Sequence, residues 1–505
     1  MAFYAPILLA CGVYYPLVPV KAIIPENLDL QKHYTDYPPA QHIPKFNPDH
    51  ALYILSQITL VPIRNKTLAD SLTDGYVPLY SPLLQKYVHE YAKYLNYFIA
   101  TGVIETDGKH WTAAYGIHAK SKGYRFVKQY EQVVTISQEY SSRSFRSVLV
   151  KKRREQYNEL REEYGHLTKW LHPECGLTID ISTALLYLQT RRDAQIRDPS
   201  LRDEKKKRNL YSFLNDNHKD PVVQFKYAKA TMEVIHSGEL GCTVDSNVGR
   251  MHTALTNMKS ELRHLLRYKE EALVSIDITS SQLYFTVVLF NKHFYTSKMR
   301  GGSSLKIEKI NTKIHKELSP HTLMLVNLIQ SFDNEIINDY KCLVGTVEEE
   351  TPSSDIYEYM LHQSQDTESP LVDRAAAKTG MFEVLFGKDK RTKVWKRYNQ
   401  LFPSVSELYQ AIKEGNYKRL ALLLQSIESH VVLKIVTKTI AKKHPHIPMF
   451  TIHDSIAVPV QYEETVRQIM EAELTRVTGL QPRLRMEYWN PKLLDWEKYR
   501  AALQS

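Results

Sequence analysis

Residues 447–460 read IPMFTIHDSIAVPV, two short apolar runs on either side of the pair His453-Asp454. Apolar runs of this length, rich in β-branched residues, favour strands, and a polar pair between them is typical of a hairpin turn. This stretch therefore predicts a β-hairpin that presents an imidazole and a carboxylate at its tip. Taken alone, the pair favours an ordinary polar turn.

A second pattern precedes the hairpin, in DRAAAKTGMFEVLFG, where Arg374, Lys378, Phe382 and Phe386 are each four residues apart. The Ala, Met and Leu content favours a helix, on which steps of four form one slowly drifting stripe about 18 Å long. Cations at one end of the stripe and rings at the other suit a nucleoside triphosphate, with charged donors on the phosphates and rings over base and sugar. The alternative is an amphipathic helix that buries its rings in a core.

A third pattern lies further upstream, in the β-type run ALVSID at 272–277, which delivers the carboxylate of Asp277 at the end of a strand. Small polar residues at 279–281 and then Gln282 follow it. A carboxylate at a strand end is well placed to hold a metal ion, although such an aspartate is also commonly a cap or turn residue.

Length and composition restrict the class of protein. With 505 residues, 43% of them hydrophobic, the chain is too long for one compact core and too apolar for disorder, so we expect two or three domains. Lys and Arg (66) exceed Asp and Glu (56), and the net charge of +10 favours polyanionic partners, nucleic acid or an acidic membrane surface. Four widely spaced cysteines without a CxxC pair argue against a disulfide framework and a thiolate zinc cluster, and favour a reducing compartment.

The N-terminal 21 residues contain an apolar run that no basic residue precedes and that three prolines interrupt. This predicts a strand or loop rather than a signal peptide. No other segment has the ~18 uncharged apolar residues of a membrane-spanning helix. We therefore expect a soluble protein of the cytoplasm, or of the host cytoplasm if a phage or mobile element encodes it.

The order of the three patterns, a strand-end carboxylate, an R-x3-K-x3-F-x3-F-G helix and an HD hairpin, resembles motifs A, B and C of the family A DNA polymerases and their single-subunit RNA polymerase relatives. The resemblance covers roughly residues 240–490. Outside the motifs it extends to DSNVGRMHTALTNMKSELR (245–263), to Asp355-Ile356-Tyr357, to YNQLFPSVSELY (398–409) and to Gln425.

This resemblance implies an α+β multidomain chain folded as a right-hand polymerase, with an antiparallel-sheet palm, helical fingers, a helical thumb and an N-terminal mixed module. The resemblance implies 240–290 for the palm with motif A, 291–415 for the fingers with motif B, and 416–505 for the palm with motif C and the C-terminus. Before it, we expect a module of unknown role at 1–135, and a thumb and connector at 136–239 from chain order. Apolar residues spaced three and four apart between Tyr157 and Leu171 predict a long amphipathic helix from 140 to 171.

The resemblance also implies roles for individual residues. Asp277 and Asp454 would hold two Mg²⁺ ions, with Mn²⁺ able to substitute, for in-line phosphoryl transfer. Lys378 would be a catalytic residue as a candidate proton donor to pyrophosphate. The incoming nucleotide would contact Arg374, Lys378, Phe382, Phe386, Gln282 and Tyr284, while template-primer nucleic acid would contact Arg250, Asn257, Gln425 and His453, the last near the primer terminus.

Several departures bear on which polymer is made. The family's glutamine follows the motif A aspartate by three residues, whereas Gln282 is five residues on, and Tyr284 takes the place of the sugar-excluding glutamate. Phe386 replaces a tyrosine and has no hydroxyl. Motif C reads HDS, as in RNA polymerases, whereas Phe382 is of the DNA-polymerase type. The balance favours a DNA-dependent DNA polymerase that extends a 3′-OH primer with weakened sugar discrimination. No DxE motif on a strand occurs in the first 240 residues, so no proofreading exonuclease is expected.

Three alternatives stay open. The HDS motif and the missing glutamate favour a single-subunit RNA polymerase or primase-like enzyme. His444, His446, His453 and Asp454 suggest an HD phosphohydrolase, but those sites lie on helices, whereas the flanks here indicate strands. The third is a non-catalytic nucleic-acid-binding protein. Such a protein would have no use for the whole set of Asp277, Asp454, Arg374 and Lys378.

Overall fold

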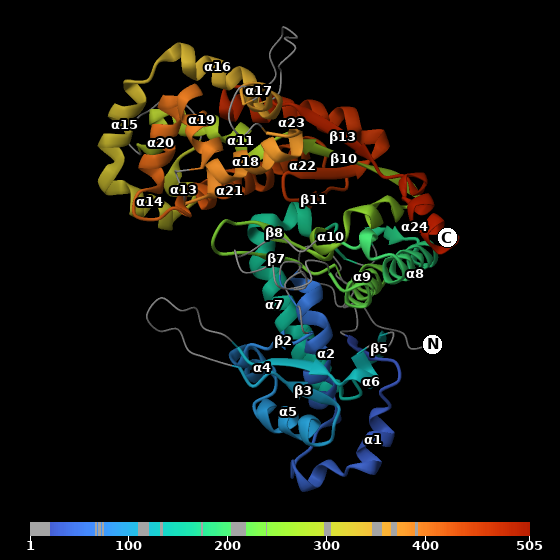
Figure 1. Cartoon of the computed structure of the whole chain (residues 1–505). Coiled ribbons are helices and arrows are strands. Elements are labelled where there is room, and N and C mark those ends of the chain that lie inside the picture. The colour runs from blue at the N-terminus through green and yellow to red at the C-terminus, as the bar shows by residue number, and fades with distance from the viewer. Residues whose placement is uncertain are drawn as a thin grey trace.

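The computed structural model describes residues 21–65, 68, 72, 75–109, 121–131, 135–172, 175–203, 219–238, 240–296, 305–345, 356–364, 371–388 and 392–504. Within these ranges the protein is α+β, with its N-terminal elements at one end, the C-terminal half at the other, and α8, α9 and α24 between them (Figure 1). The predicted N-terminal strand or loop and Asp355 lie outside the described residues.

The N-terminal module packs helices around two small antiparallel sheets, β1–β5 and β2–β4–β3. Its buried core runs from Ala22 to Leu149. The longest helix, α2, begins where Asn47 accepts hydrogen bonds from the first-turn backbone amides, with a proline at the first helical position. The elements are β1 (Lys21–Pro25), α1 (Leu30–Asp36), α2 (Pro48–Arg64), β2 (Val77–Pro78), α4 (Ser81–Tyr87), α5 (Tyr91–Ala100), β3 (Ile104–Thr106), β4 (Gly123–Phe126), α6 (Lys128–Glu131) and β5 (Thr135–Glu139).

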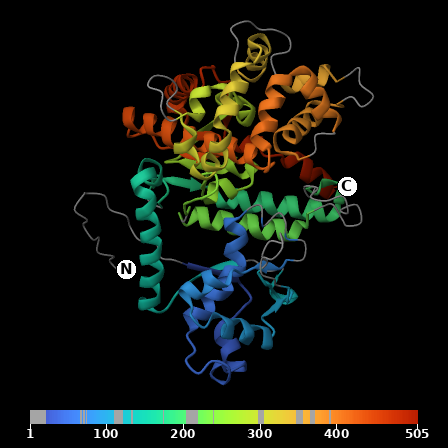
Figure 2. The same cartoon turned by 90° about the vertical axis from the view of Figure 1, so that its left-hand side faces the viewer.

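The long helix α7 (Arg143–Thr168) connects this module to the rest of the protein, and Figure 2 shows it standing along one side of the molecule. Phe145 and Leu149 belong to the N-terminal core, whereas Tyr164 and Leu167 belong to a second core that extends to Tyr499. The helix bends at Tyr164, whose φ of −122° and ψ of 18° are not helical. Three bonds fix the far end: Glu163 to Lys434 at 2.5 Å, His166 to Thr437 at 2.9 Å, and Lys169 to the Pro445 carbonyl at 2.7 Å.

A second attachment joins the module to the middle of the protein. Ile23, Leu60 and Ile63 form a small buried cluster with Ala230 of α9. The middle elements are β6 (Leu177–Ile179), α8 (Ile181–Arg197), α9 (Pro221–His236), β7 (Thr243–Val244), β8 (Met251–His252), α10 (Ala254–Asn257), the 3₁₀ helix η5 (Ser260–Leu265) and β9 (Leu266–Tyr268).

The main sheet is antiparallel and has six strands. Five of them follow the order β11–β12–β10–β9–β6, and the sixth, β13, pairs with β10 as well. Its central strand is β10 (Glu271–Ile278), where Val274 and Ile276 are fully buried. The partners that frame the site are β11 (Phe450–Ile452), β12 (Ser455–Pro459) and β13 (Leu484–Tyr488). The hairpin predicted from residues 447–460 is confirmed as β11 and β12.

Helices cover this sheet and form most of the C-terminal half (Figure 1). They are α11 (Ser281–Tyr284), the 3₁₀ helix η6 (Phe285–Phe290), α12 (Lys292–Tyr295), α13 (Ile307–Ile310), α14 (Thr312–Leu318), α15 (Thr322–Gln330), α16 (Asn334–Val344), α17 (Ile356–His362), α18 (Arg374–Phe386), α19 (Lys393–Leu401), α20 (Pro403–Lys413), α21 (Arg419–His430), the π-helical turn η8 (Val431–Val436), α22 (Thr437–Lys443), α23 (Glu463–Thr478) and α24 (Trp496–Gln504).

One continuous helical run, from α21 to α22, has the length and apolar composition of a membrane span within the described residues. However, 67% of its apolar window is buried inside the protein, and Glu428 and Lys434 interrupt it. Leu423, Leu424 and Ile427 are completely buried. The run is therefore the central core helix of the C-terminal half, and it carries one buried carboxylate.

Candidate active site

The register of the main sheet brings Asp277, on β10, next to Asp454, in the turn before β12. Asp277 lies opposite Ser455 in the β10–β12 ladder, and Asp454 immediately precedes Ser455. The turn between β11 and β12 is tight, because His453 adopts a positive φ of 56°. The two carboxylates predicted from separate motifs are thus neighbours at one edge of the buried sheet.

The electrostatics of Asp277 are those of a carboxylate beside a like charge. Burial, followed by the charge of Asp454, raises the pKa of Asp277 to about 7. The Arg485 guanidinium, 3.8 Å from Asp277 Oδ2 across the β10–β13 ladder, and the charge of Lys378 oppose this shift. Two neighbouring carboxylates whose repulsion is only partly compensated favour a divalent cation between them.

The donor set fits Mg²⁺ in composition. Mg²⁺ prefers hard oxygen ligands and is commonly held by one or two carboxylates together with waters and substrate phosphates. Within the described parts of the chain, no group of three or more His, Cys, Asp or Glu side chains is placed to hold a metal ion by itself. Asp277 and Asp454 could therefore hold a cation only together with non-protein ligands, as expected where the substrate carries phosphates.

The raised pKa of Asp277 predicts an effect on stability in the absence of metal. Because the folded-state pKa of about 7 exceeds the ordinary aspartate pKa of 3.8, ionisation of Asp277 destabilises the fold increasingly from about pH 4 to about pH 7. We expect Asp277→Asn to raise Tm by a few degrees at pH 8 in EDTA and to leave it nearly unchanged near pH 4. Thermal unfolding across this range checks it, with the exposed Asp339→Asn as control; a gain that is equal at both pH values would contradict it.

A third carboxylate, Glu428 on α21, lies in the same place and was not predicted. Its side chain is almost fully buried, and burial raises its pKa most, with the charge of Arg250 opposing the shift. Arg250 Nη2 donates to Glu428 Oε1 at 2.5 Å and Gln282 Nε2 donates to Oε2, while Ser281 Oγ lies 3.0 Å from Oε2. Ser281 Oγ also lies 2.6 Å from Asp454 Oδ2. The only available signal was the lone acidic residue in the apolar run LALLLQSIESHVVL.

The residues proposed for template-primer contact are divided between two places. Arg250 and His453 lie beside the carboxylates, and burial, followed by the charge of Arg250, lowers the pKa of His453 to about 4. The His453 ring packs edge-on against His252, with 6.3 Å between centroids. Gln425 is half-buried on α21. Arg250 is engaged by Glu428, so its guanidinium serves a contact inside the protein.

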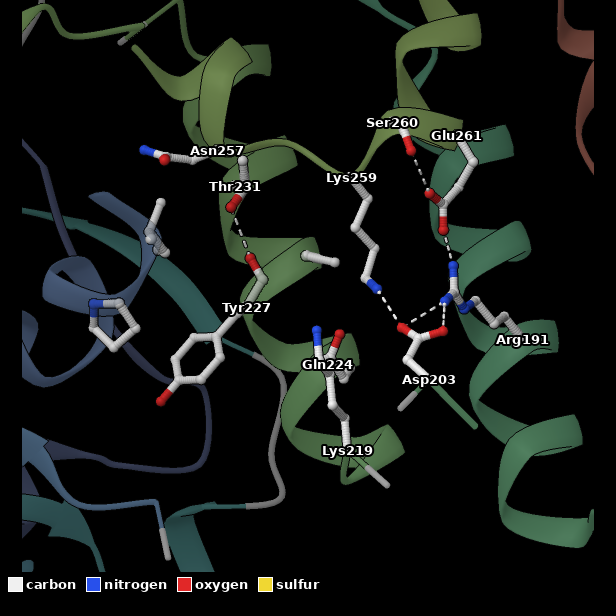
Figure 3. Close-up of a pocket in the computed structure, with 13 residues that line it drawn as sticks. Arg191, Asp203, Lys219, Gln224, Tyr227, Thr231, Asn257, Lys259, Ser260 and Glu261 are labelled. Atoms are coloured by element: carbon white, nitrogen blue, oxygen red, sulfur yellow. Dashed lines mark hydrogen bonds and ion pairs between the residues drawn. The ribbon is translucent and has the colours of Figure 1, made fainter. Parts of the chain in front are cut away.

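Asn257 lines a separate cavity of about 250 Å³ between α2, α8, α9 and η5, and the candidate carboxylates are not among its lining residues. In Figure 3, Lys259 and Arg191 converge on the carboxylate of Asp203, with Asn257 on the other side of the cavity. Burial, followed by the charge of Arg191, lowers the pKa of Lys259 to about 8. The structure therefore does not bring Asn257 together with the carboxylates.

The helix predicted from the R-x3-K-x3-F-x3-F-G pattern is α18, which begins where Asp373 accepts a hydrogen bond from the Ala376 amide at 2.7 Å. Its stripe is continuous: Lys378 Nζ lies 5.9 Å from the Phe382 ring, and Phe382 stacks on Phe386 with 5.6 Å between centroids. Lys378 and Arg374 are exposed, and Arg374 lies over the Tyr357 ring at 5.1 Å. Lys378 is close enough for its charge to act on Asp277.

Close packing holds α18 in place against α19. A Cβ atom on Gly380 would lie 2.8 Å from Val394 Cγ1, so a larger residue there would require the Val394 side chain or the helices to shift. Ala377 and Met381, on the same side, are completely buried. The cation-and-ring stripe therefore sits on a firmly packed helix, with Phe382 and Phe386 half-buried rather than enclosed in the core.

The placement of Tyr284 does not agree with a role at the nucleotide. Its side chain is completely buried, and its hydroxyl donates to the Leu480 carbonyl at 2.7 Å and bonds to Thr478 Oγ1 at 2.8 Å. Tyr284 is thus a core residue that joins α11 to the end of α23, and we do not retain it at the site. Its neighbour Gln282 instead points to Glu428.

The histidines that suggested a phosphohydrolase do not assemble a site with the HD pair. His444 ends α22 and packs against His446, whose ring also contacts Tyr462. His453 and Asp454 lie in a β-turn, not on helices. Nothing in the described part of the chain places these four residues around one metal ion.

No protein-family model and no curated protein matches this chain. Among solved structures, the chain is similar to the POL domain of Pol1 from M. smegmatis, in complex with DNA primer-template and dNTP, at 11% sequence identity and a TM-score of 0.29. That match covers 63% of this chain and 68% of the other. This likeness is weak and does not by itself assign a function.

Proposed function

We propose that this protein catalyses template-directed nucleotidyl transfer, as a Mg²⁺-dependent DNA polymerase that extends a 3′-OH primer. One observation carries the proposal: strand register pairs two carboxylates, Asp277 and Asp454, and the charge of Lys378 acts on Asp277 from a helix that continues into stacked aromatic rings. This combination has the parts that phosphoryl transfer from a nucleoside triphosphate requires, namely cation ligands, a phosphate-binding cation and a surface for the base.

The residues divide the work by their chemistry. Asp277 and Asp454 would hold divalent cations, which supply activation of the attacking 3′ oxygen and neutralisation of the leaving pyrophosphate. Arg374 and Lys378 would bind the triphosphate, and Lys378 would place a proton on pyrophosphate as it leaves. Phe382 and Phe386, stacked and half-buried, would cover the base and sugar.

The chain's choice between deoxyribose and ribose is proposed from the same helix. Phe382 and Phe386 offer no hydroxyl to a ribose 2′ oxygen, and with Tyr284 buried in the core no tyrosine hydroxyl is contributed from that position. The site would thus select the sugar by shape, which favours dNTPs over rNTPs but discriminates weakly. An RNA polymerase or primase-like enzyme, favoured by the sequence HDS, is the alternative.

The decisive experiment is extension of a labelled primer on a DNA template, with Mg²⁺ and with dNTPs and rNTPs supplied separately. We expect dNTP extension that disappears in EDTA and in Asp454→Asn. Extension with rNTPs only, or synthesis without a primer, would replace the proposal by an RNA polymerase or primase. Binding of the duplex without incorporation of either nucleotide would leave a non-catalytic nucleic-acid-binding protein.

A further inference from the structure

Glu428 is a carboxylate that a simple core helix has no reason to contain. It lies among completely buried apolar neighbours on α21, with 1% of its surface exposed. Burying a charge of this kind is costly unless it is paired and hydrogen-bonded. Glu428 meets this condition fully, because Arg250 binds one oxygen while Ser281 and Gln282 bind the other.

These contacts join segments that are distant in sequence. Arg250 precedes β8, Ser281 and Gln282 follow the central strand β10, and Glu428 belongs to α21. The chain of contacts continues from Ser281 Oγ to Asp454 Oδ2 at 2.6 Å. One hydroxyl group thus connects the buried glutamate to a carboxylate of the candidate active site.

The position of Asp454 explains what such a connection does. Asp454 lies in a two-residue turn beside the left-handed backbone of His453, and its neighbour Asp277 repels it. The bond from Ser281 opposes rotation of the Asp454 side chain away from Asp277. Ser281 in turn is held at the start of α11, where Glu428 contacts its hydroxyl and also accepts a bond from the side-chain amide of Gln282.

We propose that Glu428 is a positioning residue for Asp454 and acts through the hydroxyl of Ser281. The proposal rests on the proposed function, because it concerns the carboxylate that would hold the catalytic cation. It differs from an ordinary buried ion pair in one respect: its hydrogen-bonded connection to the active site runs through Ser281. Groups that orient the ligands of a metal ion typically change its affinity by about 10- to 100-fold.

The test is a double-mutant cycle with Glu428→Gln and Ser281→Ala, measured first by Mn²⁺ binding to the nucleic-acid-free protein, from the electron paramagnetic resonance of free Mn²⁺. Each single variant is expected to weaken Mn²⁺ binding about tenfold, and the double variant by about the same factor, because both changes break one pathway. The Mg²⁺ concentration for half-maximal incorporation should rise in parallel, with the KM for nucleotide nearly unchanged.

A matched control breaks another ion pair on the same helix. Glu317→Gln removes the partner of Arg419, whose Nε lies 2.9 Å from Glu317 Oε2, near the start of α21 and outside the Ser281 network. It should lower Tm without changing Mn²⁺ affinity. Should Glu428→Gln not fold, Ser281→Ala alone decides, since it leaves the Arg250–Glu428 pair intact.

Two results would overturn the inference: Mn²⁺ affinity unchanged in Ser281→Ala, or losses that multiply in the double variant. These outcomes are separable from failure of the proposed function. If the wild-type protein incorporates no nucleotide but Mn²⁺ binding follows the predicted cycle, the polymerase assignment fails and the positioning role stands. If incorporation is normal in both variants, the positioning role fails and the polymerase assignment stands.

Discussion

Asp454→Asn is expected to reduce Mg²⁺-dependent nucleotide incorporation by about 10³-fold or more, because a cation site worth several kcal/mol to the transition state loses one of its two carboxylates. The asparagine has nearly the same shape and retains an oxygen that can accept the 2.6 Å bond from Ser281 Oγ. The fold and the basic surfaces should therefore persist. Single-turnover incorporation with saturating dNTP measures the loss.

The control for Asp454→Asn is binding of the primer-template duplex at fixed salt concentration. Contacts with phosphates dominate such affinity and do not involve this carboxylate, so the Kd should change by no more than about twofold. Equal loss of incorporation and of duplex binding would indicate misfolding. Retained incorporation would remove Asp454 from the metal site and, with it, the central part of the proposed function.

Lys378→Ala is expected to lower kcat/KM for the incoming nucleotide by about 10²-fold, with KM raised and kcat reduced together. The reason is that Lys378 is exposed on α18, acts on Asp277 through its charge and precedes Phe382 and Phe386 on the same stripe. A cation in this place binds the triphosphate in the ground state and stabilises the charge that develops on pyrophosphate. Steady-state incorporation at varied dNTP concentration separates the two parameters.

Two variants serve as controls for Lys378→Ala. Lys378→Arg keeps the positive charge and should recover most of the nucleotide affinity but less of kcat, because a guanidinium is a poor proton donor. Lys388→Ala removes an exposed lysine just beyond the end of the same helix and should change neither parameter. Normal kinetics in Lys378→Ala would exclude this residue from the site.

Periodicity in the sequence and the order of its motifs are sufficient to predict the strands that carry the carboxylates and the helix that carries the basic side chains. The alternation in IPMFTIHDSIAVPV predicted β11 and β12, and the four-residue spacing predicted the stripe of α18. Both patterns are local, because a strand or a helix reveals its buried face within a few residues. The placement of Asp277 beside Asp454 required in addition the order of motifs along the chain, since the two are far apart in sequence.

Contacts between distant segments explain what the sequence did not predict. Glu428 is recognisable as a partner of Arg250 and Gln282 only once α21 is packed against α11, and nothing near it in sequence specifies those partners. Tyr284 was assigned by its offset from Asp277, although the apolar run YFTVVLF that it begins is typical of a buried segment. Position relative to a motif was a weaker guide there than the hydrophobic environment.

The bend at Tyr164 divides α7 into two parts whose relative angle could change. The part from Arg143 to Tyr164 is about 30 Å long, so a change of about 10° in the bend would move the Arg143 end by about 5 Å. The other end of α7 is bonded through Glu163 and His166 to η8 and α22, which precede the strand that leads to Asp454. The buried cluster of Ile23, Leu60 and Ile63 with Ala230 and the bond from Thr135 Oγ1 to Glu233 Oε2 at 3.4 Å join the module to α9, so such a movement would have to break them.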